Sequence, residues 1–233
     1  MLIISLGGSL IVPNTIDVDF VRNFQKAIAK HAKKHGGIII ICGGGSTARK
    51  YQAAFRAVKS GVFRNALDEV GIAATRLNAL FIQQVFGALA DKKIIEDPTK
   101  KHVSKKRILI GCGWKPGFST DMDAVLAAKT YGADTVVNLS DISHIYDSDP
   151  KKNPKAKPVQ RMEWKDLRKI VGNKWSPGAH LPFDPVAAKE GEKLGLRLVF
   201  LTGRNMKNFE KFLKGEKFVG TSVYKNSYIK QKK

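Results

Sequence analysis

Three glycine-rich turns are the segments of the sequence most suited to chemistry. They are Gly7-Gly8, Gly43-Gly44-Gly45 and Gly111–Gly117, and each follows a short aliphatic run that is typical of a buried strand. Glycine lets the backbone come close to a ligand, and consecutive N–H groups then form a cradle for an anion. A single turn of this kind needs no function beyond reversing the chain. Three turns with the same relation to a strand favour phosphate binding.

Polar residues near these turns are candidates for the same chemistry. Phe118-Ser119-Thr120-Asp121 opens a predicted helix, whose N-terminus caps itself with such residues or binds phosphate through its free N–H groups. Arg49 lies one turn into the helix after the glycine triplet, where a guanidinium can reach phosphoryl oxygens or simply face solvent. Asp68 begins an amphipathic helix with three more polar side chains that line a pocket or face solvent, Thr75, Arg76 and Asn78.

The elements that position these residues alternate between strands and helices. The predicted strands are Leu2–Leu6, Ile38–Ile41, Lys93–Ile95, Ile108–Ile110, Thr135–Leu139, Arg197–Leu201 and Lys217–Gly220. The predicted helices are Asp17–His35, Ala48–Val58, Asp68–Ala90, Asp121–Tyr131, Glu163–Val171 and Pro185–Leu194. His144–Tyr146 and Val159–Arg161 are expected to pair as a hairpin. This order predicts an α/β fold, a three-layer α/β/α sandwich with a mainly parallel central sheet.

Composition limits the possible classes of protein. The 233 residues suit one substantial domain, and their aliphatic runs need burial, which excludes a disordered chain. No apolar run reaches the ~20 residues that span a bilayer, and the N-terminus does not resemble a signal peptide. The separated Cys42 and Cys112 fit a reducing cytoplasm and argue against a structural zinc site. We therefore expect a cytoplasmic protein in which both thiols are buried near strand ends.

The charge is unusual, because 41 Lys and Arg against 20 Asp and Glu give a formal net charge of +21. Such chains usually bind phosphates on nucleic acids, membranes or nucleotides. Gly43-x-Gly45-x-x-Ala48 fits the dinucleotide pattern G-x-G-x-x-G/A, but no strand and acidic residue follow at the required place. The P-loop pattern G-x-x-x-x-G-K-[ST] does not occur. A nucleotide would therefore be held by another kind of cradle.

The motifs, taken together and in order, resemble the amino-acid-kinase superfamily, and among its branches the archaeal-type uridylate (UMP) kinases. The resemblance covers residues 1 to about 221 and is carried by five segments. They are Ser5-Leu6-Gly7-Gly8-Ser9, Gly43-Gly44-Gly45-x-x-Ala48-Arg49-Lys50-Tyr51, Gly71-Ile72-x-x-Thr75-Arg76-x-Asn78-Ala79, Pro116-Gly117-x-Ser119-Thr120-Asp121 and Asp147-x-Asp149-Pro150-Lys151-Lys152-x-Pro154-x-Ala156-Lys157.

The resemblance implies transfer of the γ-phosphoryl group of ATP to UMP, with Mg²⁺ accompanying the ATP. It implies catalytic roles for Arg49 and for Asp121, the latter as an orienting group rather than a general base, and assigns no protein ligand to the metal. The ATP-binding positions are Gly7, Gly8, Ser9, Gly45, Arg49, Ser140, Tyr146 and Asp149. The UMP-binding positions are Gly44, Asp68, Trp114, Lys115, Pro116, Gly117, Phe118, Ser119 and Thr120.

The same resemblance implies one domain over 1–224, with an acceptor-binding part at about 1–134, an ATP-binding part at about 135–224 and a basic tail at 225–233. It also implies a homohexamer. The nucleoside monophosphate is largely a dianion at pH 7 and can attack without a general base, which fits the lack of a His–Asp pair.

Some residues depart from the family pattern. Ser5 stands where many members of the superfamily have Lys, a replacement that archaeal-type UMP kinases share. Ser140, Ser143 and His144 differ from the usual Thr and Asp-Gly, and Gly111–Lys115 replaces a plainer turn. His144 is interpreted as a strand residue.

Three alternatives remain open. The first is a kinase for another acceptor, such as acetylglutamate, aspartate or carbamate, although no set of carboxylate-binding arginines is evident. The second is a non-catalytic nucleotide- or oxyanion-binding protein. The third is nucleic-acid binding by the basic segments, which lack the interleaved aromatic residues of single-strand binders.

Overall fold

The structure is a computed structural model that describes residues 1–150, 153–174 and 181–225. In these residues eight strands form one sheet in the order β3-β4-β2-β1-β5-β9-β10-β8, and a separate β6–β7 hairpin stands beside it. The sheet strands are β1 (Leu2–Leu6), β2 (Ile38–Cys42), β3 (Ala90–Ile95), β4 (Ile108–Gly111), β5 (Thr135–Ser140), β8 (Arg161–Glu163), β9 (Arg197–Thr202) and β10 (Thr221–Tyr224). All neighbours are parallel except β9 and β10, so the predicted fold class is confirmed.

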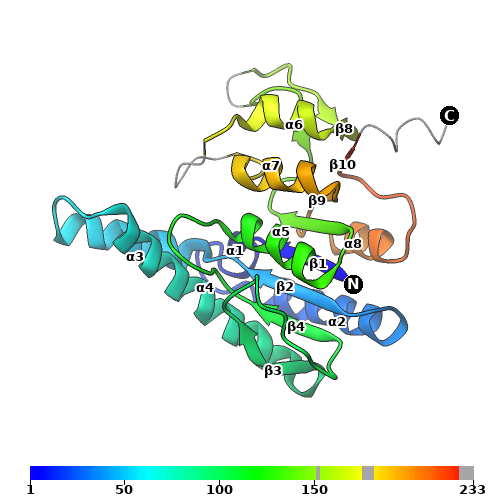
Figure 1. The fold of residues 1–233 in the computed structure, drawn as a ribbon, viewed down its shortest axis with the longest axis horizontal. Coiled ribbons are helices and arrows are strands. Elements are labelled where there is room, and N and C mark those ends of the chain that lie inside the picture. The colour runs from blue at the N-terminus through cyan, green and yellow to red at the C-terminus, as the bar shows by residue number, and fades with distance from the viewer. Residues whose placement is uncertain (151–152, 175–180, 226–233) are drawn as a thin grey trace.

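Helices cover both faces of the sheet (Figure 1). They are α1 (Gly8–Ile11), α2 (Val18–Lys34), α3 (Gly45–Val58), α4 (Arg64–Phe86), α5 (Thr120–Tyr131), α6 (Trp164–Val171), α7 (Pro185–Leu194) and α8 (Met206–Leu213). A short 3-10 turn, Gly87–Leu89, links α4 to β3.

The alternation of side chains along β2 explains the three layers. Ile38 and Ile40 pack into a core with α2, α4 and α8, whereas Ile39 and Ile41 pack into a second core with α5, α6 and α7. Successive residues of a strand point to opposite faces, so a strand that is apolar throughout needs a helical layer on each side.

Helices α3 and α4 lie side by side and extend from the body of the molecule (Figure 1). Of the residues of α3, only Gly45 and Ser46 are buried. Tyr51, with 67% of its surface exposed, and Val58, with 88%, leave apolar area uncovered along this helix.

Most predicted elements are confirmed, but several expectations are wrong or incomplete. Three elements begin earlier than predicted: α3 at Gly45, α4 at Arg64 and β3 at Ala90. The last strand is not Lys217–Gly220 but Thr221–Tyr224. The helix expected to reach Ala90 ends at Phe86, because Gly87 has a φ of +51°, which is a common way to stop a helix. Two helices were not predicted, α1 and α8.

The smaller expectations mostly agree with the structure. β6 (Ile145–Tyr146) pairs antiparallel with β7 (Pro158–Val159), as predicted, while Arg161 belongs to β8 in the main sheet. Cys42 and Cys112 are buried free thiols at strand ends. Of the predicted basic tail at 225–233, only Lys225 lies within the described residues.

Candidate active site

The turns after β1 and β2 meet backbone against backbone. A Cβ atom added to Gly8 would lie 2.1 Å from the backbone nitrogen of Gly45, and one added to Gly45 would lie 2.4 Å from the carbonyl oxygen of Gly8. Gly45 also has a φ of +62°, which side chains rarely tolerate. β1 and β2 are parallel neighbours, so their carboxyl ends bring both turns to one edge of the sheet.

Arg49 lies beside these joined turns. Its Nη1 donates a hydrogen bond to Ser9 Oγ over 3.2 Å, and both side chains lie near the surface. Ser140 reaches the same place from β5, since the Gly7 N–H donates to the Leu139 carbonyl over 2.8 Å. The structure thus brings together backbone N–H groups, a hydroxyl and an exposed guanidinium, a suitable set for phosphoryl oxygens.

The loop after β4, residues 113–119 and here called the acceptor loop, is held by side chains of two helices. Three of its backbone N–H groups donate to them: Gly113 to Thr75 Oγ1 (2.8 Å), Trp114 to Asp123 Oδ2 (3.1 Å) and Gly117 to Asp68 Oδ2 (2.9 Å). Ser119 caps α5 by accepting from the Met122 N–H over 3.2 Å, and Thr120 is the first residue of that helix. The predicted loop and Asp68 therefore lie together.

The side chains of the acceptor loop form a small cluster. Lys115 Nζ lies 3.9 Å from the centre of the Trp114 ring and 4.9 Å from that of Phe118. The two rings meet edge to face with centroids 5.0 Å apart. An ammonium over an aromatic face is attracted by the ring quadrupole, so the two rings keep the Lys115 ammonium close to the loop. Pro116, which stands between Trp114 and Phe118 in the sequence, is half-buried.

Asp121 lies in a network of hydrogen bonds below the loop. Its Oδ1 accepts from Ser5 Oγ and from Asn138 Nδ2, each over 2.8 Å, and its Oδ2 accepts from the Asp184 N–H over 3.3 Å. Burial raises the pKa of Asp121 to about 6, although these donors favour the charged form. Its acceptor capacity is directed at neighbouring residues, which suits an orienting group.

Several residues of the site were not singled out as binding residues from the sequence. Asn78 Nδ2 donates to the Gly43 carbonyl over 2.7 Å and so joins α4 to the second glycine turn. Thr75 and Asn78 are buried, whereas Arg76 pairs with Glu96 over 2.7 Å at the surface. Asn138 and Asp123 are buried polar residues, and Asn138 interrupts the apolar run Val136–Leu139, a signal that was present in the sequence.

The predicted ATP-binding positions Ser140, Tyr146 and Asp149 come from β5, which pairs with β1 on the side away from β2, and from the β6–β7 hairpin and the residues after β6. Ser140 ends β5, and its Oγ accepts from the Ile142 N–H over 3.2 Å. Tyr146 lies in β6 opposite Pro158, and the Asp149 carbonyl accepts from the Asn153 N–H over 2.8 Å. The β6–β7 hairpin is also joined to β10, since Thr221 Oγ1 accepts from the Ile145 N–H, and Ile145 packs into the core with α5, α6 and α7. The roles of Tyr146 and Asp149 stay predictions.

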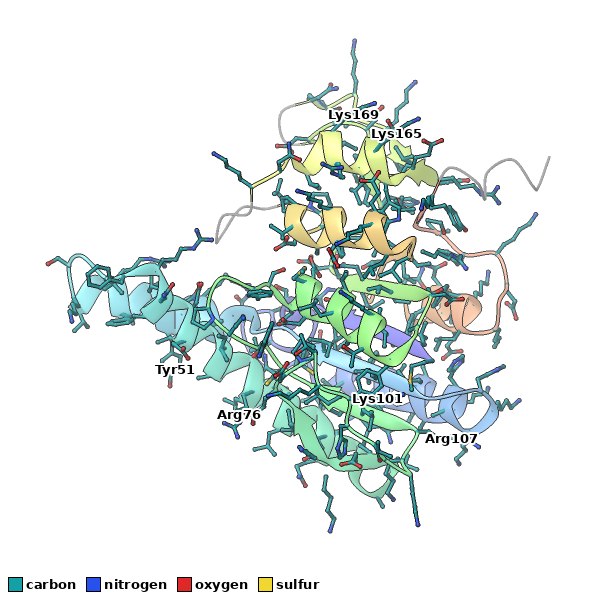
Figure 2. The ribbon with its side chains drawn as sticks, in the orientation of Figure 1. Tyr51, Arg76, Lys101, Arg107, Lys165 and Lys169 are labelled. Atoms are coloured by element: carbon teal, nitrogen blue, oxygen red, sulfur yellow. The ribbon has the colours of Figure 1, made fainter. Side chains whose placement is uncertain are left out.

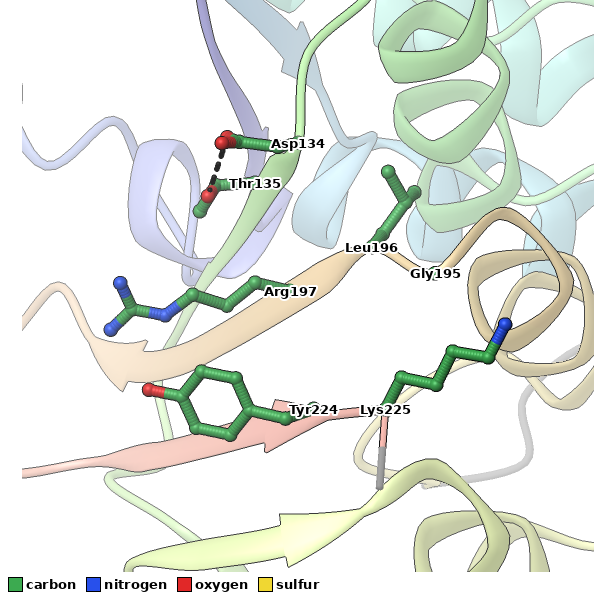
Figure 3. A pocket seen from close by; sticks show the side chains of 7 residues that line it. All are labelled: Asp134, Thr135, Gly195, Leu196, Arg197, Tyr224 and Lys225. Atoms are coloured by element: carbon green, nitrogen blue, oxygen red, sulfur yellow. Dashed lines mark hydrogen bonds between the residues drawn. The ribbon is translucent and has the colours of Figure 1, made fainter. Parts of the chain in front are cut away.

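Two cavities lie away from the joined glycine turns. One, of about 160 Å³, is at the opposite edge of the sheet, between Thr135, Arg197 and Tyr224 (Figure 3). The other, of about 280 Å³, lies between α3 and α4 and reaches Asp68. Among the described residues no cluster of three His, Cys, Asp or Glu side chains is placed to hold a metal ion, nor is any helix long and apolar enough to cross a membrane.

The positive charge is distributed over the surface. Figure 2 shows Lys165 and Lys169 on α6 at one end of the molecule, and Arg76 and Arg107 toward the other. Lys165 and Lys169 pair with Glu163 and Asp166, over 2.7 and 2.8 Å, in exposed ion pairs that contribute little to stability.

Known proteins resemble the chain over almost its whole length. The model of the amino acid kinase family matches residues 1–201. The uridylate kinases of Methanospirillum hungatei and Methanoregula boonei are 32% and 34% identical to it, over 97% and 96% of this chain and 95% and 96% of theirs. The crystal structure of uridylate kinase from Archaeoglobus fulgidus superposes with a TM-score of 0.81 at 31% identity, covering 95% of this chain and 99% of that one.

Proposed function

Because the chain belongs to the amino acid kinase family, we propose that it is a uridylate kinase, which transfers the γ-phosphoryl group of ATP to UMP and forms UDP and ADP. It would serve pyrimidine nucleotide biosynthesis. Support comes from relatives named uridylate kinase that align over nearly all of both chains.

One contact carries the proposal, the hydrogen bond from the Gly117 N–H to Asp68 Oδ2 over 2.9 Å. It joins two segments, far apart in the sequence, that were both expected to bind UMP. The acceptor loop would wrap the UMP phosphate with Lys115 and with the N–H groups at the start of α5, beginning at Thr120, and Asp68 would bind the nucleoside. Gly44, which precedes the first residue of α3, would also contact UMP.

The donor ATP would lie along the joined glycine turns. The N–H groups of Gly7, Gly8 and Gly45, with Ser9, would hold its phosphates, and Ser140, Tyr146 and Asp149 its nucleoside. Arg49 would stabilise the negative charge that spreads over the transferred phosphoryl group. Asp121 would orient this region through Ser5 and Asn138, and no residue needs to accept a proton from the UMP dianion.

Mg²⁺ would enter with ATP. Magnesium sites of this kind use substrate phosphates and few protein carboxylates. When bound, the ion neutralises charge on the phosphates.

The oligomeric state and the cellular location are proposals as well. We propose a homo-oligomer, a hexamer by family resemblance, in the cytoplasm. Support comes from α3 and α4, whose exposed Tyr51, Val58, Leu77 and Leu80 leave apolar area that a second copy would cover. Residues 1–134 would form the acceptor-binding part and 135–224 the ATP-binding part, with the ATP phosphates reaching the glycine turns of the first part.

A coupled kinase assay with UMP, CMP, dUMP, acetylglutamate and aspartate tests the activity. Formation of ADP with UMP alone supports the proposal, and formation of ADP with acetylglutamate or aspartate alone points to another acceptor on the same fold. Absence of transfer to all of these acceptors would point to a binding protein without catalytic activity.

The variant Arg49→Ala tests the mechanism. Loss of one charge-stabilising donor lowers kcat by about a hundredfold in comparable sites, so we expect a fall of that order. Arg22→Ala, on the surface of α2 and paired with Asp19, is the matched control and should keep full activity. Unchanged turnover in Arg49→Ala would remove Arg49 from the mechanism.

A further inference from the structure

We infer that Asp123 is a positioning residue for the acceptor, because it fixes the Trp114 end of the acceptor loop in the shape that receives UMP. This inference rests on the proposed function of the loop. Asp123 is two residues beyond Asp121 on α5, and the two carboxylates act on different parts of the site. Asp121 is hydrogen-bonded to strands β1 and β5, whereas Asp123 is hydrogen-bonded to the loop.

The environment of Asp123 is costly for a carboxylate. Its surface is 0% exposed, and within the described residues its Oδ1 has no hydrogen-bond partner. Asp121 and Asp184 lie close enough to disfavour a further negative charge. Burial, the largest of these causes, raises the pKa of Asp123 to about 8. Burying a polar group without full pairing lowers stability, so we look for the role of this carboxyl in the binding site rather than in the stability of the fold.

The hydrogen bond of this side chain to the acceptor loop indicates its role. Asp123 Oδ2 accepts from the Trp114 N–H over 3.1 Å, at a residue of the acceptor loop whose ring lies 3.9 Å beneath Lys115 Nζ. Fixing the Trp114 backbone therefore also fixes the ring, the ammonium above it and the neighbouring Phe118. A loop ordered before binding loses less entropy when the ligand arrives, which strengthens binding.

Two substitutions test the inference. Asp123→Ala removes the acceptor of the Trp114 N–H, so we expect the KM for UMP to rise about tenfold, the effect of one lost hydrogen bond. The KM for ATP and kcat should stay within about twofold of the wild type, well below that effect. Asp123→Asn keeps a carbonyl oxygen at the same place and should restore the KM for UMP.

Stability separates this role from a merely structural one. Asp123→Asn removes the buried charge but keeps an oxygen that can accept from the Trp114 N–H, so we expect it to melt at or above the wild-type temperature at pH 8. Asp123→Ala leaves that N–H without its acceptor and should melt below the wild type. The matched control is Asp91→Ala, because Asp91 also holds a loop, through Ser104 and the Lys93 N–H, but at the amino end of β3 rather than at the carboxyl end of β4, which the acceptor loop follows. Asp91→Ala should lower the melting temperature and leave the KM for UMP unchanged.

Two results would overturn the inference: an unchanged KM for UMP in a folded Asp123→Ala protein, or an Asp123→Asn protein as impaired as Asp123→Ala. If Asp123→Ala does not fold, Asp123→Val takes its place with the same expected outcomes. A wild-type protein without activity on UMP would instead refute the proposed function.

Discussion

The acceptor loop and the β6–β7 hairpin on the donor side are held by different kinds of contact. The acceptor loop, residues 113–119, is bonded to Asp68 and Thr75 of α4, which are 49 and 38 residues away from their partners. Within the described residues the hairpin has hydrogen bonds between its own residues, since Asp147 Oδ1 accepts from the Lys157 N–H over 2.9 Å, and it also packs Ile145 into the core with α5, α6 and α7. Asn153 Nδ2 also donates to Ser148 Oγ over 3.0 Å.

This difference separates two ways of building a binding surface. The shape of the acceptor loop depends on the packing of α4 and α5, so it is established by the whole fold and suits selection of one acceptor. The shape of the hairpin depends in part on bonds between its own turn residues. The hairpin is also joined to β10, where Thr221 Oγ1 accepts from the Ile145 N–H over 2.9 Å. Changes to distant anchors should therefore affect UMP more than ATP.

The largest effect is expected for Asp68→Ala. It removes the partner of the Gly117 N–H and the proposed contact with the nucleoside, so the KM for UMP should rise by tenfold or more. The KM for ATP should not change in the same steady-state assay. The neighbouring exposed residue provides the control, Glu69→Ala, which should match the wild type. An equal rise in both KM values would show that the two sides are not independent.

A pH titration of stability distinguishes the acceptor side from other carboxylates. The pKa of Asp123 is about 8 in the folded protein and that of an unfolded Asp is about 4, so the folded state binds this proton more tightly. Its contribution to stability is complete below about pH 4 and is lost as the pH rises toward 8. The melting temperature of Asp123→Asn minus that of the wild type should therefore grow from about pH 4 to pH 8.

Asp91 should show the opposite sign. Hydrogen bonds from Ser104 and the Lys93 N–H lower the pKa of its carboxyl, so its contribution is present above the unfolded pKa and is lost as the pH falls. Asp91→Asn should therefore lower the melting temperature at neutral pH and have less effect in acid. A difference for Asp123→Asn that does not vary with pH would contradict the assignment of a raised pKa.

The fold was largely predictable because its central elements carry strong patterns. β2 is continuously apolar, β1 is apolar except for Ser5, and α2 has apolar residues at helical spacing, so none of the three depends on distant contacts for its identification. The last strand was misplaced because Phe218 and Val219 look like strand residues. The Asn208 side chain occupies the N–H and the carbonyl of Val219, each over 2.7 Å, so that backbone cannot pair in a sheet.

The site was predictable to the extent that parallel strands impose it. The meeting of the glycine turns of β1 and β2 follows from their adjacency. The hydrogen-bond partners of the acceptor loop could not be predicted from the sequence. The bond from the Trp114 N–H to Asp123 depends on which face α5 turns toward the loop and on the path of the loop over that face. α8 was missed although Asn205 caps it and Phe209 and Leu213 are spaced by one helical turn.

The smallest effect is expected for Asp147→Ala on the donor side. The substitution removes the acceptor of the Lys157 N–H and the partner of the Ser148 hydroxyl, 3.2 Å away, but leaves the β6–β7 pairing and the Thr221 link in place. Because the hairpin has these other bonds, the KM for ATP should rise only about threefold, the lower range for one exposed hydrogen bond. The KM for UMP, measured at saturating ATP, should not change. A larger effect on UMP than on ATP would contradict the separation of the two sides, since it would mean that the hairpin also determines the shape of the acceptor loop.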